Sequence, residues 1–288
     1  MADQSSIFTR PTHVPVLYHY CDLGGLKGML ESGNIWATNI EDLADETELR
    51  YGTDKVANEV LNESRNLIHG NIDLARVANA VRVFPSILDM MRVYEDVPSA
   101  SFLNNEFYVS CFSSARDSLP GWNSFSDRGK GYAIGLKYNW VSPCSDQFKH
   151  YDPIEMVYAE AETDRVAKDI SKKVIQEAKE SNDKYSWVQK LGDVFTLKAV
   201  DFESEKEWRL IWTESAYSSH HYPKRTRESK VSIRNIRYVE IPLDQWELAE
   251  IISGPRADFA NAKYAVSKWK GPVANDCKAT KSAIRLWR

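Results

Sequence analysis

The chain has 288 residues, of which 43% are hydrophobic and 27% charged, and its formal net charge is −4. A chain of this length can bury a sizeable core as one large domain or two small ones. The charge gives no global attraction to nucleic acid, although a local patch could still bind it. Because there is no run of about eighteen apolar residues and no secretion signal in residues 1–10, we expect a cytoplasmic protein with no membrane partner.

The cysteines give no sign of a zinc site or a disulfide framework. Cys21, Cys111, Cys144 and Cys277 lie far apart and include no Cys-x-x-Cys pair, which is typical of reduced thiols. The glycine-rich dinucleotide and Walker motifs, the His-Glu-x-x-His zinc motif and the Gly-x-Ser-x-Gly nucleophile motif are also missing. The familiar enzyme classes that carry these signatures are therefore excluded.

The first part of the chain alternates short strands and helices. Apolar residues at Leu23, Leu26, Met29 and Leu30 have helical spacing, and Gly33 is a typical residue to end that helix. The expected elements are a strand at 15–20, a helix at 23–30, a strand at 35–37, a loop that turns into a helix at 39–48, and a largely helical stretch at 53–93.

The second part contains most of the predicted strands. The expected elements are a strand at 106–113, a loop and short helix at 114–125 with Asp117 as a cap and Pro120 in its first turn, a turn and strand at 128–136, a helical block at 163–191, strands at 202–212, 235–241 and 248–254, and a helix that begins at Pro255. We therefore predict one α+β domain over residues 1–288, with helical insertions at about 53–100 and 160–195.

The segment 202–212 carries the most informative pattern. If it forms one strand, Glu205, Glu207 and Arg209 project from one face, and Trp208 and the other apolar residues from the opposite face. Two carboxylates beside a guanidinium form either a candidate site or a solvated row of ion pairs, and the pattern alone favours the ion pairs.

Four other segments have a functional and a structural interpretation. For Arg128–Tyr132 a glycine turn is favoured over phosphate binding, and for His220–His221 a polar loop is favoured over metal ligation. For Lys224–Lys230 a solvated basic loop is favoured over contact with a phosphate. For Asp45, Glu46 and Glu48 an acidic helix start is favoured over cation binding.

Short sequence blocks in a fixed order resemble the domain of unknown function 2971 family over residues 16 to 270. Ala44 departs from the asparagine that this family usually has there. The blocks are Leu17-Tyr-His-Tyr20, Leu26-Lys-Gly-Met-Leu-Glu-Ser-Gly33, Ile35-Trp-Ala37, Leu43-Ala-Asp-Glu-Thr-Glu48, Cys111-Phe-Ser113, Trp122 with Gly131-Tyr-Ala-Ile-Gly135, Glu205-Lys-Glu-Trp-Arg209 and Ile251-Ile-Ser-Gly-Pro255.

That family in turn resembles the ADP-ribosyltransferase fold, which implies a split sheet of mixed, mainly antiparallel strands and NAD as the substrate. By this resemblance His19 holds the NAD ribose, and Glu207 is the catalytic carboxylate, with Glu205 as the preceding member of the pair. The strand ending at Ser113 and the helix with Trp122 would enclose nicotinamide. The residues implied in NAD binding are His19, Tyr20, Phe112, Ser113, Trp122, Tyr132 and Arg209.

This resemblance implies an enzyme that transfers ADP-ribose to an unidentified protein or nucleic acid, or hydrolyses NAD, as a toxin or phage-defence effector. Cleavage of the nicotinamide–ribose bond develops positive charge on the sugar, which a carboxylate stabilises, so no metal is needed. One alternative is a metal-dependent nuclease, with a cation on Asp45, Glu48, Glu205 and Glu207 and the basic loop on phosphate. The other is a non-catalytic nucleotide-binding module.

Overall fold

The computed structural model describes residues 14–43, 46–66, 73–84, 106–139, 153–181, 186–214, 222–228 and 235–285. Several residues discussed above lie outside this part of the chain, namely Asp45, Cys144, His220, His221, Lys230 and residues 85–100 of the first insertion. The side chains of Glu46 and Glu48 also lie outside the described residues. No helix among the described residues is long and apolar enough to cross a membrane.

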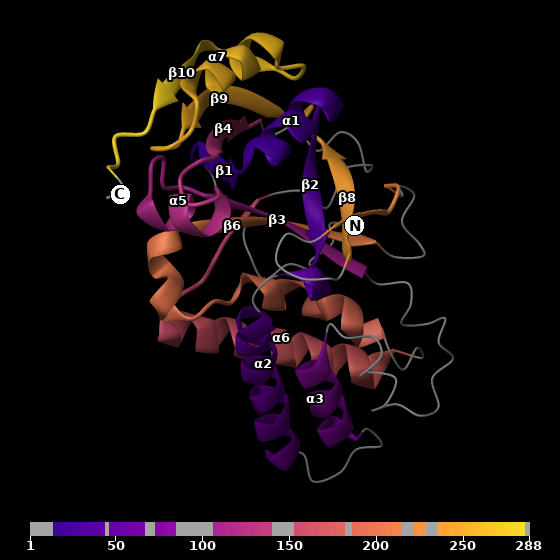
Figure 1. The fold of residues 1–288 in the computed structure, drawn as a ribbon. Helices are drawn as coiled ribbons and strands as arrows, with labels where there is room; N and C mark the ends of the chain where they lie inside the picture. Colours follow the sequence, from indigo (N-terminus) through magenta and orange to yellow (C-terminus); the bar gives the residue numbers. More distant parts are fainter. Residues whose placement is uncertain are drawn as a thin grey trace.

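A mixed sheet forms the centre of the molecule (Figure 1). Its main path runs β10-β9-β4-β1-β3-β2-β8-β7, and β6 pairs with β3 and β5. All named pairs are antiparallel except β9 and β10, so the expected α+β class and mixed sheet are confirmed. The strands are β1 Leu17–Cys21, β2 Asn34–Asn39, β3 Glu106–Ser113, β4 Tyr132–Tyr138, β5 Ile154–Glu155, β6 Glu207–Glu214, β7 Arg225–Glu228, β8 Asn235–Pro242, β9 Trp246–Ser253 and β10 Val273–Lys281.

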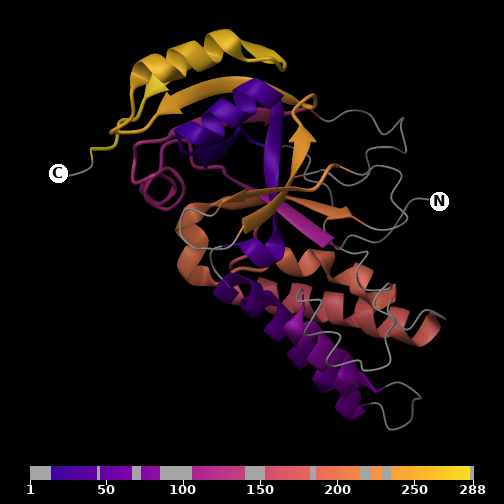
Figure 2. The same ribbon diagram turned by 45° about the vertical axis from the view of Figure 1, so that its right-hand side comes forward.

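The two helical insertions form one layer on the sheet, at the end away from α7 and β10 (Figures 1 and 2). Val60 and Val81 of the first insertion share a buried core with Ile170 and Leu191 of the second and with Phe107 of β3. The α-helices are α1 Leu23–Ser32, α2 Glu46–Asn66, α3 Leu74–Val83, α5 Leu119–Phe125, α6 Glu160–Glu180 and α7 Phe259–Lys268, and the 3₁₀ segments are η1 Ile40–Asp42, η2 Ser186–Thr196 and η3 Val200–Glu205.

A second core lies between the sheet and the helices α1 and α7. Leu26 of α1 and Ala262 of α7 pack with the tryptophans of β6 and with Phe112 of β3. Trp208 and Trp212 face this core as expected from the alternating pattern of β6. The opposite row of β6 includes Glu207 and Arg209 and faces the helical layer, where the Arg209 guanidinium donates to the Phe195 carbonyl over 2.9 Å.

The structure differs from the predicted elements at several places, three of which concern the segments around the candidate site and the C-terminal helix. The charged segment 202–212 is not one strand, because Val200–Glu205 is a 3₁₀ helix and Lys206 has a left-handed backbone with φ 46° and ψ 48°. The C-terminal helix begins at Phe259 with Asp258 as its N-cap, while Pro255 lies in a turn. Ser118, rather than Asp117, caps α5.

Candidate functional site

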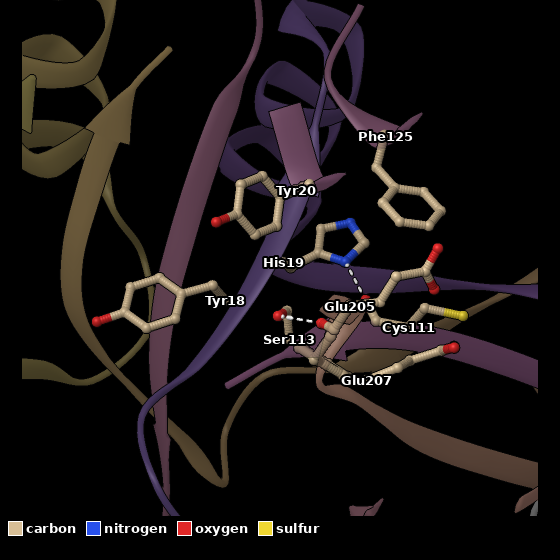
Figure 3. Close-up of a pocket in the computed structure, with 10 residues that line it drawn as sticks. Tyr18, His19, Tyr20, Cys111, Ser113, Phe125, Glu205 and Glu207 are labelled. Carbon is tan, nitrogen blue, oxygen red and sulfur yellow. Dashed lines mark hydrogen bonds between the residues drawn. The ribbon is translucent and has the colours of Figure 1, made fainter. Parts of the chain in front are cut away.

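A pocket opens where β1, β3, α5 and the junction of η3 with β6 meet (Figure 3). About 450 Å³ of space lies between its walls, part of it open to solvent. Its lining residues are Tyr18, His19, Tyr20, Cys111, Phe112, Ser113, Gly121, Phe125, Glu205 and Glu207.

The pocket lies at a gap between neighbouring strands. One edge of β3 pairs with β1 only at Ser113 and with β2 only at Val109 and Tyr108. Between these positions the carbonyl oxygen of Cys111 lies 3.0 Å from the Nδ1 of His19. An imidazole from β1 therefore takes the place of a backbone partner, and the gap becomes one side of the pocket.

His19 is set up to act as a neutral hydrogen-bond acceptor. Burial lowers its pKa, the hydrogen bond to Cys111 opposes that shift, and the charge of Arg227 lowers the pKa further. A neutral ring whose Nδ1 donates to the Cys111 carbonyl leaves Nε2 without a proton. Nε2 can then accept a hydrogen bond from a ligand hydroxyl.

The two carboxylates of the pocket are held by buried cations. The Nζ of Lys198 lies 2.5 Å from Glu205 and 2.7 Å from Glu207. The Nε of Arg209 lies 2.7 Å from the other oxygen of Glu207. The exposed share of the side chain is 15% for Glu205 and 5% for Glu207, so Glu205 is the more accessible carboxylate.

The buried cations keep Glu207 ionised. Burial alone would raise its pKa, but the charges of Arg209 and Lys198 and their hydrogen bonds hold the pKa at about 2. Burial and the Glu207 charge raise the pKa of Cys111, so this thiol is not activated as a nucleophile. The Tyr158 hydroxyl accepts a hydrogen bond from the Glu207 backbone, 2.8 Å away, which fixes the start of β6.

Helix α5 forms the outer wall. Its close approach to β1 requires Gly121, because a Cβ there would lie 2.6 Å from the Tyr20 ring. Phe125, at the end of α5, is 47% exposed and lines the pocket. The loop before α5 is tied down by Asp117, which accepts hydrogen bonds from the Trp122 indole at 2.6 Å and the Ser282 hydroxyl at 2.7 Å.

Six of the predicted site residues line this one pocket, and they come from three separate segments. They are His19, Tyr20, Phe112, Ser113, Glu205 and Glu207. The Ser113 hydroxyl donates to the Glu205 carbonyl over 2.6 Å and so joins β3 to the turn at Lys206. The Tyr20 hydroxyl donates to Ala115 instead of facing the pocket.

Three other residues named from the sequence do not line the pocket. Trp122 was expected to cover a nicotinamide ring, but it is fully buried and packs edge-on against Tyr20. Tyr132 is 1% exposed and donates to the carbonyl of Asp258. Arg209 is 2% exposed and contacts Glu207 from behind the pocket.

The sequence analysis missed Lys198 and Phe125. A signal for Lys198 was available, because it is the single charged residue in the segment from Val194 to Val200. A lone lysine in an apolar segment needs a buried partner. Phe125 had no such signal, because its exposure depends on where α5 ends.

The residues proposed for a divalent cation are only partly described. Glu205 and Glu207 share the ammonium group of Lys198, and Asp45 and the Glu48 side chain lie outside the described residues. Within the described ranges no group of three or more His, Cys, Asp or Glu residues could hold a metal ion. The basic run also differs from the expected loop, because Arg225–Glu228 forms the edge strand β7.

Comparison with known proteins gives one match. Searches of curated proteins and of solved structures found no significant similarity to this chain. The model of one family, described as "Protein of unknown function (DUF2971)", matches residues 122–210. This range contains β4, the second helical insertion and the Glu205–Arg209 block, and the resemblance of the chain to the DUF2971 family is thereby confirmed.

Proposed function

We propose that this chain is an NAD-consuming enzyme with an ADP-ribosyltransferase-like core, which transfers ADP-ribose to a macromolecule or hydrolyses NAD. The observation that carries the proposal is the meeting of His19 with Glu205 and Glu207 in one pocket, although they are far apart in the sequence. The pocket combines a neutral imidazole acceptor, two carboxylates and exposed aromatic surface. These groups suit a cationic aromatic ring joined to a ribose.

Each group has a role in breaking the nicotinamide–ribose bond. The Nε2 of His19 accepts a hydrogen bond from a ribose hydroxyl, and Phe125 packs on the nicotinamide ring. Glu205, the more accessible carboxylate, binds a second ribose hydroxyl. Glu207 supplies a fixed negative charge that stabilises the positive charge developing on the sugar. Nicotinamide leaves, and either water or an acceptor group attacks the sugar carbon.

The buried ion pairs also bear on the nuclease alternative. A catalytic divalent cation needs carboxylate oxygens that are free to coordinate it. Here Lys198 already lies between Glu205 and Glu207, and Arg209 takes the second oxygen of Glu207. This arrangement favours NAD chemistry at the pocket. We propose that such an activity operates in the cytoplasm as a toxin or phage-defence function.

The deciding experiment incubates the protein with NAD labelled in the adenine moiety, with and without cell protein, RNA and DNA. Free nicotinamide measures bond cleavage, and retention of label on a macromolecule measures transfer. The Glu207→Gln variant should lose nicotinamide release, while Glu162→Gln, an exposed residue of α6 in the helical layer, should keep it.

Two outcomes would contradict the proposal. Binding of NAD with no cleavage under any condition would leave a non-catalytic nucleotide-binding module. Cleavage of RNA or DNA that EDTA abolishes and magnesium or manganese restores would establish the nuclease instead.

A further inference from the structure

The basic run that begins at Lys224 contains one cation that differs from its neighbours. Strand β7 pairs with β8 in the register Arg225↔Tyr238 and Arg227↔Ile236. The Nζ of Lys224 lies 2.7 Å from Glu106, and Arg225 lies 3.3 Å from Glu240. These two cations are already paired, and contact with a ligand phosphate would compete with those pairs.

Arg227 makes no ion pair with any carboxylate in the described part of the chain. Its guanidinium carbon lies 5.3 Å from the ring centroid of Trp36 and 5.9 Å from that of Tyr238. Arg227 is an exposed residue of the edge strand, and its partial burial against these rings lowers its pKa. Contact with the rings offsets part of the cost of partly desolvating this charge. The N–H groups at the edge of the guanidinium still lack an anionic partner.

The aromatic platform beneath Arg227 is rigid. Trp36 of β2 and Tyr238 of β8 have ring centroids 5.2 Å apart. Helix α1 approaches the Trp36 ring so closely that a Cβ on Gly28 would lie 2.4 Å from its Cζ2 atom. A guanidinium that rests on a fixed platform loses little entropy when it binds an anion.

This platform lies beside the gap that contains His19. The Ser110 hydroxyl donates to the Trp36 carbonyl over 2.7 Å, and the next residue of β3, Cys111, has its carbonyl bound by His19. The charge of Arg227 contributes to the lowered pKa of His19, which indicates that the two groups lie within electrostatic range of each other. The pocket and the guanidinium can therefore contact two parts of one extended ligand.

We propose that Arg227 binds the diphosphate of the dinucleotide whose ribose lies against His19. This inference rests on the proposed function, since it identifies a second contact for the same ligand. The planar guanidinium presents parallel N–H groups that match two phosphate oxygens, and contact with the two rings limits the orientations that it can adopt. Arg227 is thus a binding residue for the phosphate part of the ligand and does not touch the bond that breaks.

The test uses calorimetric binding of two probes, ADP-ribose, which contains the diphosphate, and nicotinamide riboside, which contains no phosphate. Arg227→Gln should weaken the binding of ADP-ribose by roughly 10- to 100-fold, the range for loss of a charge-assisted contact, and leave nicotinamide riboside unchanged. Arg227→Lys should restore part of the affinity. The matched control is Arg225→Gln, two residues away on the same edge strand, which should change neither affinity by more than about 3-fold.

The proposal is overturned if the wild-type protein fails to bind ADP-ribose or if Arg227→Gln binds it as tightly as wild type does. It is overturned too if Arg227→Gln loses affinity for ADP-ribose and for nicotinamide riboside to the same extent. It is also overturned if a short single-stranded RNA, and not ADP-ribose, is the probe whose affinity depends on Arg227. NAD cleavage is measured separately. Arg227-dependent ADP-ribose binding without cleavage would remove the proposed enzymatic function and retain this site. Cleavage of NAD together with undiminished ADP-ribose affinity in Arg227→Gln would remove this site and retain the proposed enzymatic function.

Discussion

The ammonium group of Lys198 lies 2.7 Å from the Glu207 carboxylate, and 1% and 5% of these side chains are exposed. The same ammonium also holds Glu205. The sequence pattern favoured a solvated row of charges, but the structure has a buried network in which Glu207 depends on two cations for its ionised state. Stability and function are linked through this one lysine.

Lys198→Met should be strongly destabilising. The variant keeps an apolar side chain of similar length but leaves Glu205 and Glu207 without their shared cation, which costs about 3–5 kcal/mol in comparable buried pairs. Urea denaturation measures the change. Arg165→Met is the control, because Arg165 also has two carboxylate partners, Glu162 and Asp169, but is 58% exposed, and its loss should cost less than about 1 kcal/mol. Equal effects of the two substitutions would show that the buried network is not what stabilises this region.

Stability should fall in acid partly through Glu207. Its pKa in the folded protein is about 2, below the usual value of 4.5, so its contribution is present above about pH 4.5 and is lost as the pH falls toward 2. The full contribution is on the order of 3 kcal/mol. Unfolding free energy measured from pH 6 to pH 2.5 should decline less steeply for Glu207→Gln than for wild type. Parallel curves would indicate that Glu207 is not held ionised.

Two substitutions of His19 separate its structural and binding roles. His19→Asn keeps a donor near the position of Nδ1 for the Cys111 carbonyl and removes Nε2, so it should retain stability and lose most NAD affinity. His19→Gln places its amide near the position of Nε2 and gives up the bond to Cys111, so it should retain more affinity and lose stability. Calorimetric NAD binding and thermal unfolding of both variants check this. Retained NAD affinity in His19→Asn would exclude a ligand contact at Nε2.

The two carboxylates should differ in kinetics. Glu207→Gln removes the fixed charge and should lower kcat for nicotinamide release about 100-fold or more, with a smaller change in KM. Glu205→Gln retains a hydrogen-bonding group at the more accessible position, so its effect on kcat should be milder and its KM should rise. Steady-state nicotinamide release measures both. Equal turnover in wild type and Glu207→Gln would leave this carboxylate a purely structural role.

The two aromatic residues of α5 should respond in opposite ways. Trp122→Ala removes a fully buried side chain and should cost about 3–5 kcal/mol of stability. Phe125→Ala removes a half-exposed ring at the pocket and should cost less than about 1 kcal/mol while weakening NAD binding. Denaturation and binding measured on the same samples distinguish the roles. Unchanged NAD affinity in Phe125→Ala would show that the pocket binds its ligand without this ring.

The elements that sequence analysis located best are those with a clear local pattern. The strand at 106–113 has the predicted bounds, because it is a continuous run of apolar, aromatic and β-branched residues. Strand β10 was missed because Val273–Lys281 is mostly polar and alternates little, and it exists only because β9 offers an edge. Helix α7 begins later than predicted because Asp258 acts as its N-cap. An aspartate that accepts a hydrogen bond from the first turn defines a helix start more strongly than a proline at position 255 does.

The candidate site was predictable to the extent that it depends on sequence motifs. His19 and Glu207 were found through short blocks, although neither block indicates that β1 and β3 separate beside Cys111. The placement of Trp122 could not be predicted, because a tryptophan in a short helix packs inward or outward according to the strand beneath it. Here Gly121 lets Tyr20 approach, and the indole is covered.

The connection from β10 to α5 has a consequence for biosynthesis. Ser282 and the backbone of Ala283 hold Asp117, which in turn holds Trp122 in the helix that forms the outer pocket wall. A ribosome therefore has to extend the chain past residue 283 before this wall is anchored. A nascent or prematurely terminated chain carries every residue of the pocket, yet lacks the brace that fixes α5. The proposed NAD-consuming activity would thus be withheld until Ser282 and Ala283 have been synthesised and hold Asp117.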